Sequence, residues 1–195
     1  MTIHSTLRRA AASIAALGLS TVLLAGCMIT SATNLVSPGE AATPLPASFS
    51  MTTFAYEDGT YLRSDEAPAA YTLNGSFYAD EAESIQATFV PLEGTQYLVA
   101  LAGEDSTIYG VARIENDVME IRMLLSGDIA TYLPSPPAGI EIIDGGITVT
   151  DRAGLDAAIA LVRDGTIATD PLLAWIGTGE APATLVPENG WYKAQ

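Results

Sequence analysis

Two groups of carboxylates in the chain have the type and spacing that acid–base chemistry or cation binding requires. They are Asp80, Glu81 and Glu83, and Glu115, Asp117 and Glu120. Two carboxylates can act on a glycosidic bond, and carboxylate oxygens also bind calcium. Neither group fits the calcium-loop pattern D-x-[DN]-x-[DN]-G, and both fall at expected turns or strand ends. We therefore interpret both as solvated turns and predict no metal site, the first group being the candidate for a bound cation.

Other side chains suited to catalysis are scarce. The only histidine is His4, the only cysteine is Cys27 and the only lysine is Lys193, near the C-terminus. Once the N-terminal segment described next is removed, Ser-His-Asp and Cys-His systems, zinc sites built on imidazole or thiolate, and iron–sulfur clusters lack their essential groups. No P-loop or G-x-S-x-G motif occurs, and Gly177-Thr178-Gly179 lacks the third glycine of a dinucleotide loop. The sequence therefore predicts a protein that is not an enzyme and that binds no cofactor.

The first 26 residues have the three parts of an export signal. A basic stretch with Arg8 and Arg9 precedes an apolar run over residues 10–24, and small residues follow before Cys27. The apolar run is shorter than the roughly 20 residues that a membrane-spanning helix needs. We therefore predict a signal peptide over residues 1–26 rather than an anchor helix.

The sequence Leu24-Ala25-Gly26-Cys27 resembles the lipobox of bacterial lipoprotein precursors. The resemblance covers residues 1–27 only, and an ordinary secretory signal with a chance cysteine is the alternative. It implies that a diacylglyceryl group is attached to the Cys27 thiol and that signal peptidase II cuts before this residue. By resemblance to enterobacterial sorting, Met28 in place of Asp favours the outer membrane. The implied protein is anchored in the cell envelope by lipid on Cys27, with its domain facing the periplasm or the surface.

The mature chain is strongly acidic. Cleavage removes Arg8 and Arg9 and leaves six basic and 23 acidic side chains, which changes the formal charge from −15 to about −17. Such a charge repels nucleic acid and anionic lipid headgroups, and it can steer a cationic partner, such as a cationic envelope protein, toward the surface. With one cysteine, no disulfide can form within the chain. Stability must therefore come from the hydrophobic core, for which about 169 residues suffice in one domain.

Residues 27–48 and residues 49–195 differ in composition. The first stretch is rich in Ser, Ala, Thr, Pro and Gly, which predicts a lipidated cysteine followed by a flexible tether. The second predicts a single β-rich domain. Leu35, Val36 and Leu45 are large apolar residues of the first stretch that could instead dock onto the domain, which leaves this boundary open.

Turn residues between β-rich runs predict three hairpins. Asp58-Gly59 and Asn74-Gly75 are strong hairpin signals, because both central positions of the preferred two-residue turn need positive φ. Asp144-Gly145-Gly146 predicts a third hairpin between residues 140–143 and 147–150. These signals place antiparallel strand pairs at both ends of the domain.

Between the hairpins, the sequence predicts a four-stranded antiparallel meander. Its strands cover residues 85–92, 95–102, 107–115 and 118–124. Short links between them force antiparallel neighbours, because parallel pairs need a crossover of a dozen or more residues. In the third strand one parity holds Ile108, Ala112 and Ile114, and the other holds Tyr109, Val111 and Arg113. This alternation predicts one core face and one partly wet face.

The C-terminal third predicts two helices. Leu155, Ile159 and Val162 recur at helical spacing, with Thr150 or Asp151 as N-cap, which indicates an amphipathic helix packed on the sheet. Asp170-Pro171 before an apolar run ending at Gly177 predicts a second, short helix. We also expect Trp191 and Tyr192 to pack on the core. The predicted fold is mainly β (α+β), an antiparallel β-meander that forms a sandwich or an open barrel, with these two helices added.

Two functions remain open on the sequence alone. The first is a membrane-anchored envelope lipoprotein that acts as a non-catalytic binding or structural module. The alternative is a lipocalin-like carrier of a small apolar ligand, which requires a pocket of at least about 300 Å³. The shape of the domain is the observation that separates the two.

Overall fold

The computed structural model describes residues 28–125, 127–143 and 145–195, and these form a mainly β fold. The strands are β1 (Ile29–Ser31), β2 (Ser48–Glu57), β3 (Thr60–Arg63), β4 (Ala69–Asn74), β5 (Phe77–Asp80), β6 (Gln86–Pro91), β7 (Gln96–Ala102), β8 (Thr107–Glu115), β9 (Val118–Leu125), β10 (Ile140–Ile143), β11 (Gly146–Val149), β12 (Thr169–Trp175), β13 (Thr184–Glu188) and β14 (Trp191–Ala194). The helices are η1, a 3-10 helix (Pro38–Glu40), α1 (Ile129–Tyr132) and α2 (Arg152–Arg163).

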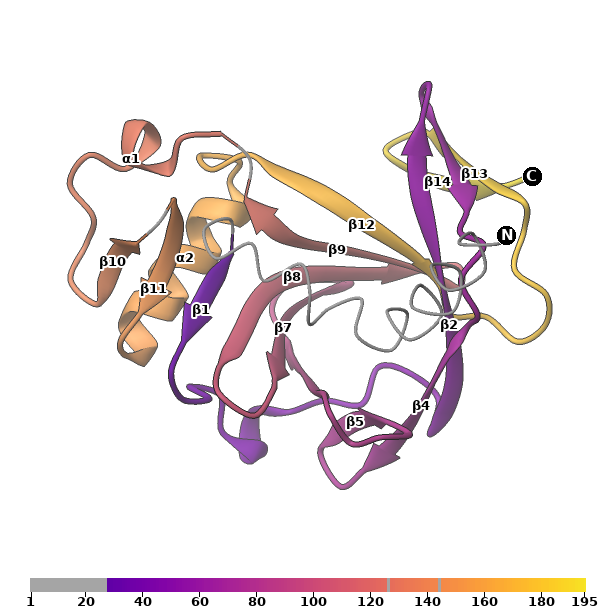
Figure 1. Ribbon diagram of the computed structural model, residues 1–195, viewed down its shortest axis with the longest axis horizontal. Coiled ribbons are helices and arrows are strands. Elements are labelled where there is room, and N and C mark those ends of the chain that lie inside the picture. Colours follow the sequence, from indigo (N-terminus) through magenta and orange to yellow (C-terminus); the bar gives the residue numbers. More distant parts are fainter. Residues whose placement is uncertain (1–27, 126, 144) are drawn as a thin grey trace, which may run out of the picture.

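Eight of the strands close an antiparallel barrel. Around the barrel they follow the order β2, β4, β5, β6, β7, β8, β9 and β12, and β12 pairs again with β2. Short ribbons extend the sheet at two places: β1, β11 and β10 continue from β8, and β3, β13 and β14 continue from β2. The two ribbons lie on opposite sides of Figure 1. The predicted antiparallel meander is confirmed, and the barrel is closed rather than open.

All three predicted hairpins form. Asp58 and Gly59 have positive φ between β2 and β3, and Gly75 has positive φ between β4 and β5. The strands β10 and β11 pair as the third hairpin, from Ile140 opposite Val149 to Ile143 opposite Gly146. Local turn chemistry therefore sets these registers.

Both faces of β8 are buried from Thr107 to Ala112, so the predicted partly wet face is wrong for this part of the strand, and only its end, from Arg113 onward, is partly exposed. The inward side chains of all eight barrel strands form one apolar cluster, which includes Ile108 and Ala112. Tyr109 and Val111 point outward and belong to a second cluster, which α2 and the ribbon β1-β11-β10 complete. Apolar clusters cover β8 on both faces, so its side chains do not alternate between apolar and polar there. The alternation in the sequence of this strand is weak for that reason.

Helix α2 begins and ends close to the predicted positions and covers the outside of the barrel. The side chain of Asp151 caps its N-terminus by accepting a hydrogen bond from the Gly154 N–H at 2.8 Å. Leu155, Ile159 and Val162 are buried against the outward cluster. In Figure 1 the helix lies behind β10 and β11. The helix thus packs against the outer face of the barrel wall.

Gly154 is needed at the contact between α2 and the loop before β10. An added Cβ at this position would collide with the carbonyl group of Gly139. In an unconstrained helix, Gly to Ala stabilises by about 1 kcal/mol. Here we expect Gly154→Ala to lower the free energy of unfolding by about 2–3 kcal/mol, because backbone must move to relieve the overlap. Urea unfolding measures this change, and a more stable Gly154→Ala variant would show that the close approach is not required.

The second predicted helix is wrong, because residues 169–175 form strand β12. This strand fills the gap between β9 and β2 and closes the barrel. Leu172 and Ala174 pack into the barrel, whereas Leu173 joins the cluster on the outside. Pro171 is tolerated because the register with β9 shifts between Asp170 and Pro171. Hydrogen bonding on both edges of the strand outweighs the local helix signal.

The predicted tether is also wrong for the described part, residues 28–48; Cys27 lies outside the described residues. Strand β1 pairs parallel with β11 and antiparallel with β8, and Ile29 is fully buried. Val36 and Leu45 are buried too. Composition is a poor guide here because a few apolar residues hold a Pro- and Ser-rich segment in place.

Two buried tyrosines bind this N-terminal segment to the barrel. The Tyr109 hydroxyl donates to the Thr33 carbonyl at 3.1 Å and accepts from the Leu35 N–H at 2.8 Å. The Tyr78 hydroxyl makes the same pair of bonds with Leu45, at 2.7 and 3.1 Å. Each hydroxyl thus serves one backbone donor and one backbone acceptor, which explains why phenols can be buried at these positions.

The C-terminal ribbon packs on the barrel as expected. Trp191 is buried, its indole N–H donates to the Glu115 carbonyl at 3.1 Å, and Tyr192 packs against the same cluster. Arg113 lies over the Trp191 ring, 4.2 Å from its centroid. The prediction that Trp191 and Tyr192 pack on the core is confirmed.

Candidate functional site

Two clefts flank the loop of residues 64–68. Strands β3 and β4 pair with the same strand, β2, and the loop between them leaves the sheet. The Ser64 N–H still donates to the Thr53 carbonyl at 2.9 Å, and the Glu66 N–H turns back to the Ser64 hydroxyl. Pro68 has no N–H to offer to the sheet. This local divergence opens space on both sides of the loop.

The first cleft, which we call the barrel-end cleft, has a volume of about 560 Å³. It is lined by Met51, Thr53, Phe54, Ala55, Ser64, Glu66, Ala67, Pro68, Ala69, Ala70, Tyr71, Asp80, Glu81, Ala82, Ile85 and Leu172. Met51, Tyr71 and Leu172 also pack against the cluster inside the barrel. The floor of the cleft is therefore continuous with the barrel interior. Its size falls within the range of small-ligand sites, about 300–1,000 Å³.

The charged side chains that line the barrel-end cleft are all acidic: Glu66, Asp80 and Glu81. Asp80 is held in place, because its carboxylate accepts from the Ser84 N–H at 2.8 Å and the Ser84 hydroxyl at 2.6 Å. Burial raises the pKa of Tyr71, and the charge of Asp80 raises it further. The Tyr71 ring stacks on Phe49 with ring centroids 5.4 Å apart.

The centre of the barrel is packed with side chains. Val99, Ala112 and Ala174 are fully buried there, and Tyr78 is 1% exposed. Tyr78 makes edge-on contacts with Phe49 and Phe89. A ligand in the barrel-end cleft would therefore lie at the end of the barrel, over its packed core.

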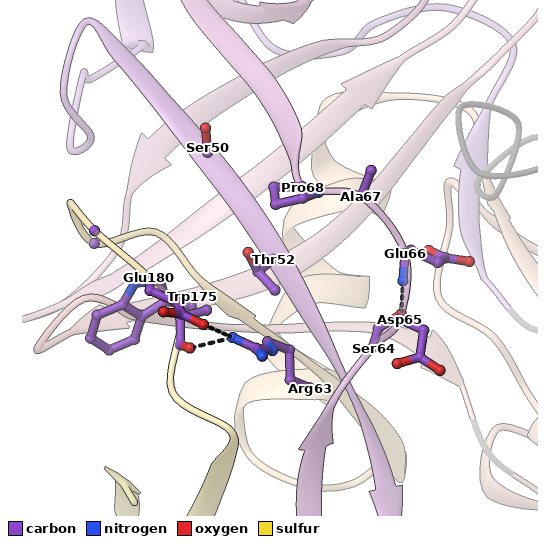
Figure 2. Close-up of a pocket in the computed structure, with 13 residues that line it drawn as sticks. Ser50, Thr52, Arg63, Ser64, Asp65, Glu66, Ala67, Pro68, Trp175 and Glu180 are labelled. Carbon is purple, nitrogen blue, oxygen red and sulfur yellow. Dashed lines mark hydrogen bonds and ion pairs between the residues drawn. The ribbon is translucent and has the colours of Figure 1, made fainter.

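The second cleft, the Trp175 cleft, lies on the other side of the loop and has a volume of about 570 Å³. Figure 2 shows the Arg63 guanidinium directed toward Glu180, to whose carboxylate it donates at 3.1 Å. It also donates to the Ala181 carbonyl at 2.8 Å. Among the described residues, no acceptor lies within hydrogen-bond distance of the buried Trp175 indole N–H.

The two clefts differ in what they can bind. Figure 2 draws residues that line the Trp175 cleft: Trp175 and Glu180 lie on one side of strand β2, and Asp65 and Glu66 lie on the other. Glu66 lines both clefts. In the Trp175 cleft the one basic side chain that lines it, Arg63, is already paired with Glu180. Hydroxyls and carboxylates make up much of its wall, whereas the barrel-end cleft is mainly apolar. We therefore consider the barrel-end cleft the better candidate for a ligand site.

A third cleft of about 290 Å³ lies between the end of α2 and strands β7, β8 and β9. It is lined by three arginines, each paired with a carboxylate: Arg113 with Glu115, Arg122 with Glu120 and Arg163 with Glu93. Glu120 is buried and also accepts from the Tyr192 hydroxyl at 2.8 Å. Burial, with the hydrogen bond and charge of Glu120, raises the pKa of Tyr192. The pairing neutralises these arginines and leaves little attraction for an anion.

The first group of predicted site residues does not form a cluster. Asp80 ends strand β5 and bonds to the turn that follows, while Glu81 and Glu83 are exposed in that turn. Among the described residues, no group of three or more His, Cys, Asp or Glu side chains is placed to hold a metal ion. Two of the three, Asp80 and Glu81, instead reappear on the rim of the barrel-end cleft.

The second group contradicts the interpretation as a solvated turn at one residue. Asp117 lies in the β8–β9 turn with positive φ, as Asn116 does, and Glu115 ends β8. Glu120, however, is buried under Tyr192 and paired with Arg122. Its burial depends on the β14 ribbon, which folds back from 70 residues away in a way that local sequence does not encode.

The lipobox residues Leu24, Ala25, Gly26 and Cys27 lie outside the described residues. Within the described part of the chain, no helix is long and apolar enough to cross a membrane. The described chain begins at Met28, which is buried against the barrel-interior cluster.

The residues that line the barrel-end cleft carry little signal in the sequence. Leu172 lies in the run of residues that predicts a helix, and Tyr71 lies in a run that predicts a hairpin strand. Met51 and Ala69 carry no local signal, since they meet only when β2 pairs with β4. An interrupted strand, with Ser64 to Pro68 between two β-rich runs, is the one feature that could have indicated an opening there.

No protein-family model matches this chain, and no curated protein or solved structure matches it. Fold and clefts define its class: a closed eight-stranded antiparallel β-barrel, extended by two ribbons and covered on one side by a helix. Such a barrel is compatible with a binding module, including one of lipocalin-like type.

Proposed function

We propose that this chain is a lipid-anchored protein of the bacterial cell envelope that binds a small, partly apolar ligand in the barrel-end cleft. The lipobox-like residues Leu24 to Cys27 support the anchor, and residues 1–26 would act as its signal peptide. The scarcity of nucleophiles and general bases supports binding without catalysis. The role we propose is thus that of a carrier or receptor, with the outer membrane as its location.

One observation carries the binding proposal: the floor of the barrel-end cleft consists of side chains that also pack in the barrel interior. Met51, Tyr71 and Leu172 are held by close-packed neighbours and are only partly buried, so apolar surface is presented on a rigid base. Burial of apolar surface drives association at roughly 25 cal/mol per Å². A pre-formed apolar site of this kind favours a ligand with an apolar part.

A cleft-filling substitution tests this proposal. Ala69 is exposed, lines the cleft and pairs with Met51 across the strands. We expect Ala69→Trp to fill the cleft and to weaken binding of the uncharged fluorescent probe N-phenyl-1-naphthylamine by at least about tenfold, or 1.4 kcal/mol. Binding is measured by the rise in probe fluorescence during titration.

Thr72→Trp is the matched control, since Thr72 is exposed on the other face of the same strand and does not line the cleft. It is expected to bind the probe within about twofold of the wild type, because its added ring points away from the site. Thermal unfolding verifies that both variants fold. Equal probe binding by Ala69→Trp and the wild type, or no binding by the wild type, would contradict the proposed function.

A further inference from the structure

We infer that the ligand of the barrel-end cleft is a cationic amphiphile, that is, an apolar chain or ring system with a positively charged amine or quaternary ammonium group. This inference rests on the proposed function and names the ligand class of the same site. It follows from how apolar and charged side chains are distributed over the cleft.

The apolar part of the ligand has a defined place. Met51 and Leu172 are floor residues that pack against the barrel interior, and Ile85 and the exposed Ala69 add to the apolar lining. The stacked pair of Phe49 and Tyr71 backs this wall. An alkyl chain or a ring can be buried there without displacing a hydrogen-bonded group.

The charged part of the ligand has a defined sign. Glu66 comes from the loop of residues 64–68, and Asp80 and Glu81 come from the end of β5 and the turn after it, so carboxylates approach the cleft from two separate elements. No Lys or Arg is among the described residues that line this cleft. An anionic headgroup would meet three like charges without a counter-charge, whereas a cation would meet three opposite charges.

The state of Tyr71 supports the same sign. Tyr71 lines the cleft, and its phenol is neutral at physiological pH, as an ordinary tyrosine is, so it adds an aromatic ring without a negative charge. An aromatic face attracts a cation through its quadrupole. The ring and the carboxylates therefore favour the same headgroup.

The described arginines that line the other two clefts are paired with carboxylates. Arg63 lines the neighbouring Trp175 cleft and is paired with Glu180, and the arginines of the third cleft are paired with Glu93, Glu115 and Glu120. The third cleft shares no lining residue with the barrel-end cleft. The whole chain has a formal charge of −15 before cleavage. Its negative electrostatic potential attracts a cation, as the carboxylates of the cleft do.

Three amphiphiles with the same twelve-carbon chain test the inference: dodecyltrimethylammonium, dodecyl sulfate and the uncharged dodecyl maltoside. Each is added below its critical micelle concentration to the folded mature protein. Its affinity is measured by the displacement of N-phenyl-1-naphthylamine from the cleft. We expect dodecyltrimethylammonium to bind tightest and dodecyl sulfate weakest. The difference in affinity between these two amphiphiles should become smaller as the salt concentration rises from 0.01 to 1 M, because the screening length falls from about 30 to 3 Å.

A double variant, Glu66→Gln with Glu81→Gln, removes two rim charges and retains Asp80, which the turn after β5 needs. It is expected to weaken dodecyltrimethylammonium binding by roughly fivefold and to leave dodecyl maltoside within about twofold, since exposed ion pairs are individually weak. The matched control replaces Glu104 and Glu141, which are exposed and do not line the cleft.

The outcomes separate this inference from the proposed function on which it rests. Equal affinity for all three amphiphiles, tighter binding of dodecyl sulfate, or no effect of the rim variant would overturn the charge inference while an apolar site remained. Failure of all three amphiphiles and of the uncharged probe to bind would overturn both.

Discussion

Replacing Cys27 by serine is expected to release this protein from the membrane fraction and to abolish its labelling with palmitate. A thioether-linked diacylglyceryl group requires the Cys27 sulfur, and no second cysteine is present to replace it. Each buried methylene contributes about 0.8 kcal/mol to membrane binding, so loss of two or more chains removes many kcal/mol of attachment. The acidic surface offers no electrostatic substitute at an anionic membrane. The measurement is labelled-palmitate incorporation together with an immunoblot of washed membranes.

A control substitution keeps the lipobox-like residues and changes a nearby exposed residue, as in Thr33→Ser. This control is expected to be labelled and membrane-bound like the wild type. A Cys27→Ser variant that still carried palmitate, or a wild-type protein that was never labelled, would refute the proposed lipid anchor. The binding proposal for the barrel-end cleft would be unaffected, since it depends on the folded barrel alone.

The second large effect, a loss of folding stability, is expected for a charged substitution at Ile29. This residue is fully buried between two strands, opposite Ile147 of β11 and Tyr109 of β8. Ile29→Asp places a charged group in an apolar cluster without a partner, which should cost more than about 4 kcal/mol or shift the carboxyl group to its neutral form at a similar cost. We expect the variant to unfold at much lower urea concentration than the wild type, or to fail to fold at 37 °C.

Thr33→Asp tests the same substitution at an exposed position of the same segment. It should change the free energy of unfolding by no more than about 0.5 kcal/mol, as surface substitutions usually do. If residues 28–48 were a free tether, both aspartates would be tolerated alike. That result would contradict the docking of this segment.

Docking of the N-terminal segment changes the expected position of the domain at the membrane. A free tether over residues 27–48 would reach roughly 70 Å when extended. With Met28 buried and β1 beginning at Ile29, an acylated Cys27 would instead be followed at once by folded structure. Under the proposed anchor, the domain would then lie against the bilayer surface, and its ligand would be exchanged close to the membrane.

The predictions that succeeded rest on interactions between neighbours in sequence. The hairpin at Asp58-Gly59 forms because both residues adopt the positive φ that a tight turn needs. In the second hairpin Gly75 alone has positive φ, and Asn74 is the last residue of β4, opposite Phe77. Helix α2 forms because Asp151 caps it and because Leu155, Ile159 and Val162 share one face. Both signals act within a few residues, so they can be read without knowing the rest of the fold.

The predictions that failed concern residues whose environment is built by distant parts of the chain. Residues 170–176 begin with a helix start signal. They nevertheless belong largely to strand β12, because this strand pairs with β9 on one edge and with β2 on the other. Residues 28–48 read as a tether, yet the Tyr78 and Tyr109 hydroxyls and the edge of β8 bind them. In both cases tertiary hydrogen bonds and burial outweigh local preferences of about 1 kcal/mol or less per residue.

The amino-acid sequence by itself determined the acidic charge, the antiparallel strand pairs and the amphipathic helix, because each depends on composition or on contacts between near neighbours. Only the tertiary structure decided that the barrel closes, that the N-terminal segment docks, and that Met51, Tyr71 and Leu172 meet beside Glu66 and Asp80. Closure brings together strands that are more than 100 residues apart, such as β2 and β12. The cleft exists only after that closure, because its walls come from four separate parts of the chain.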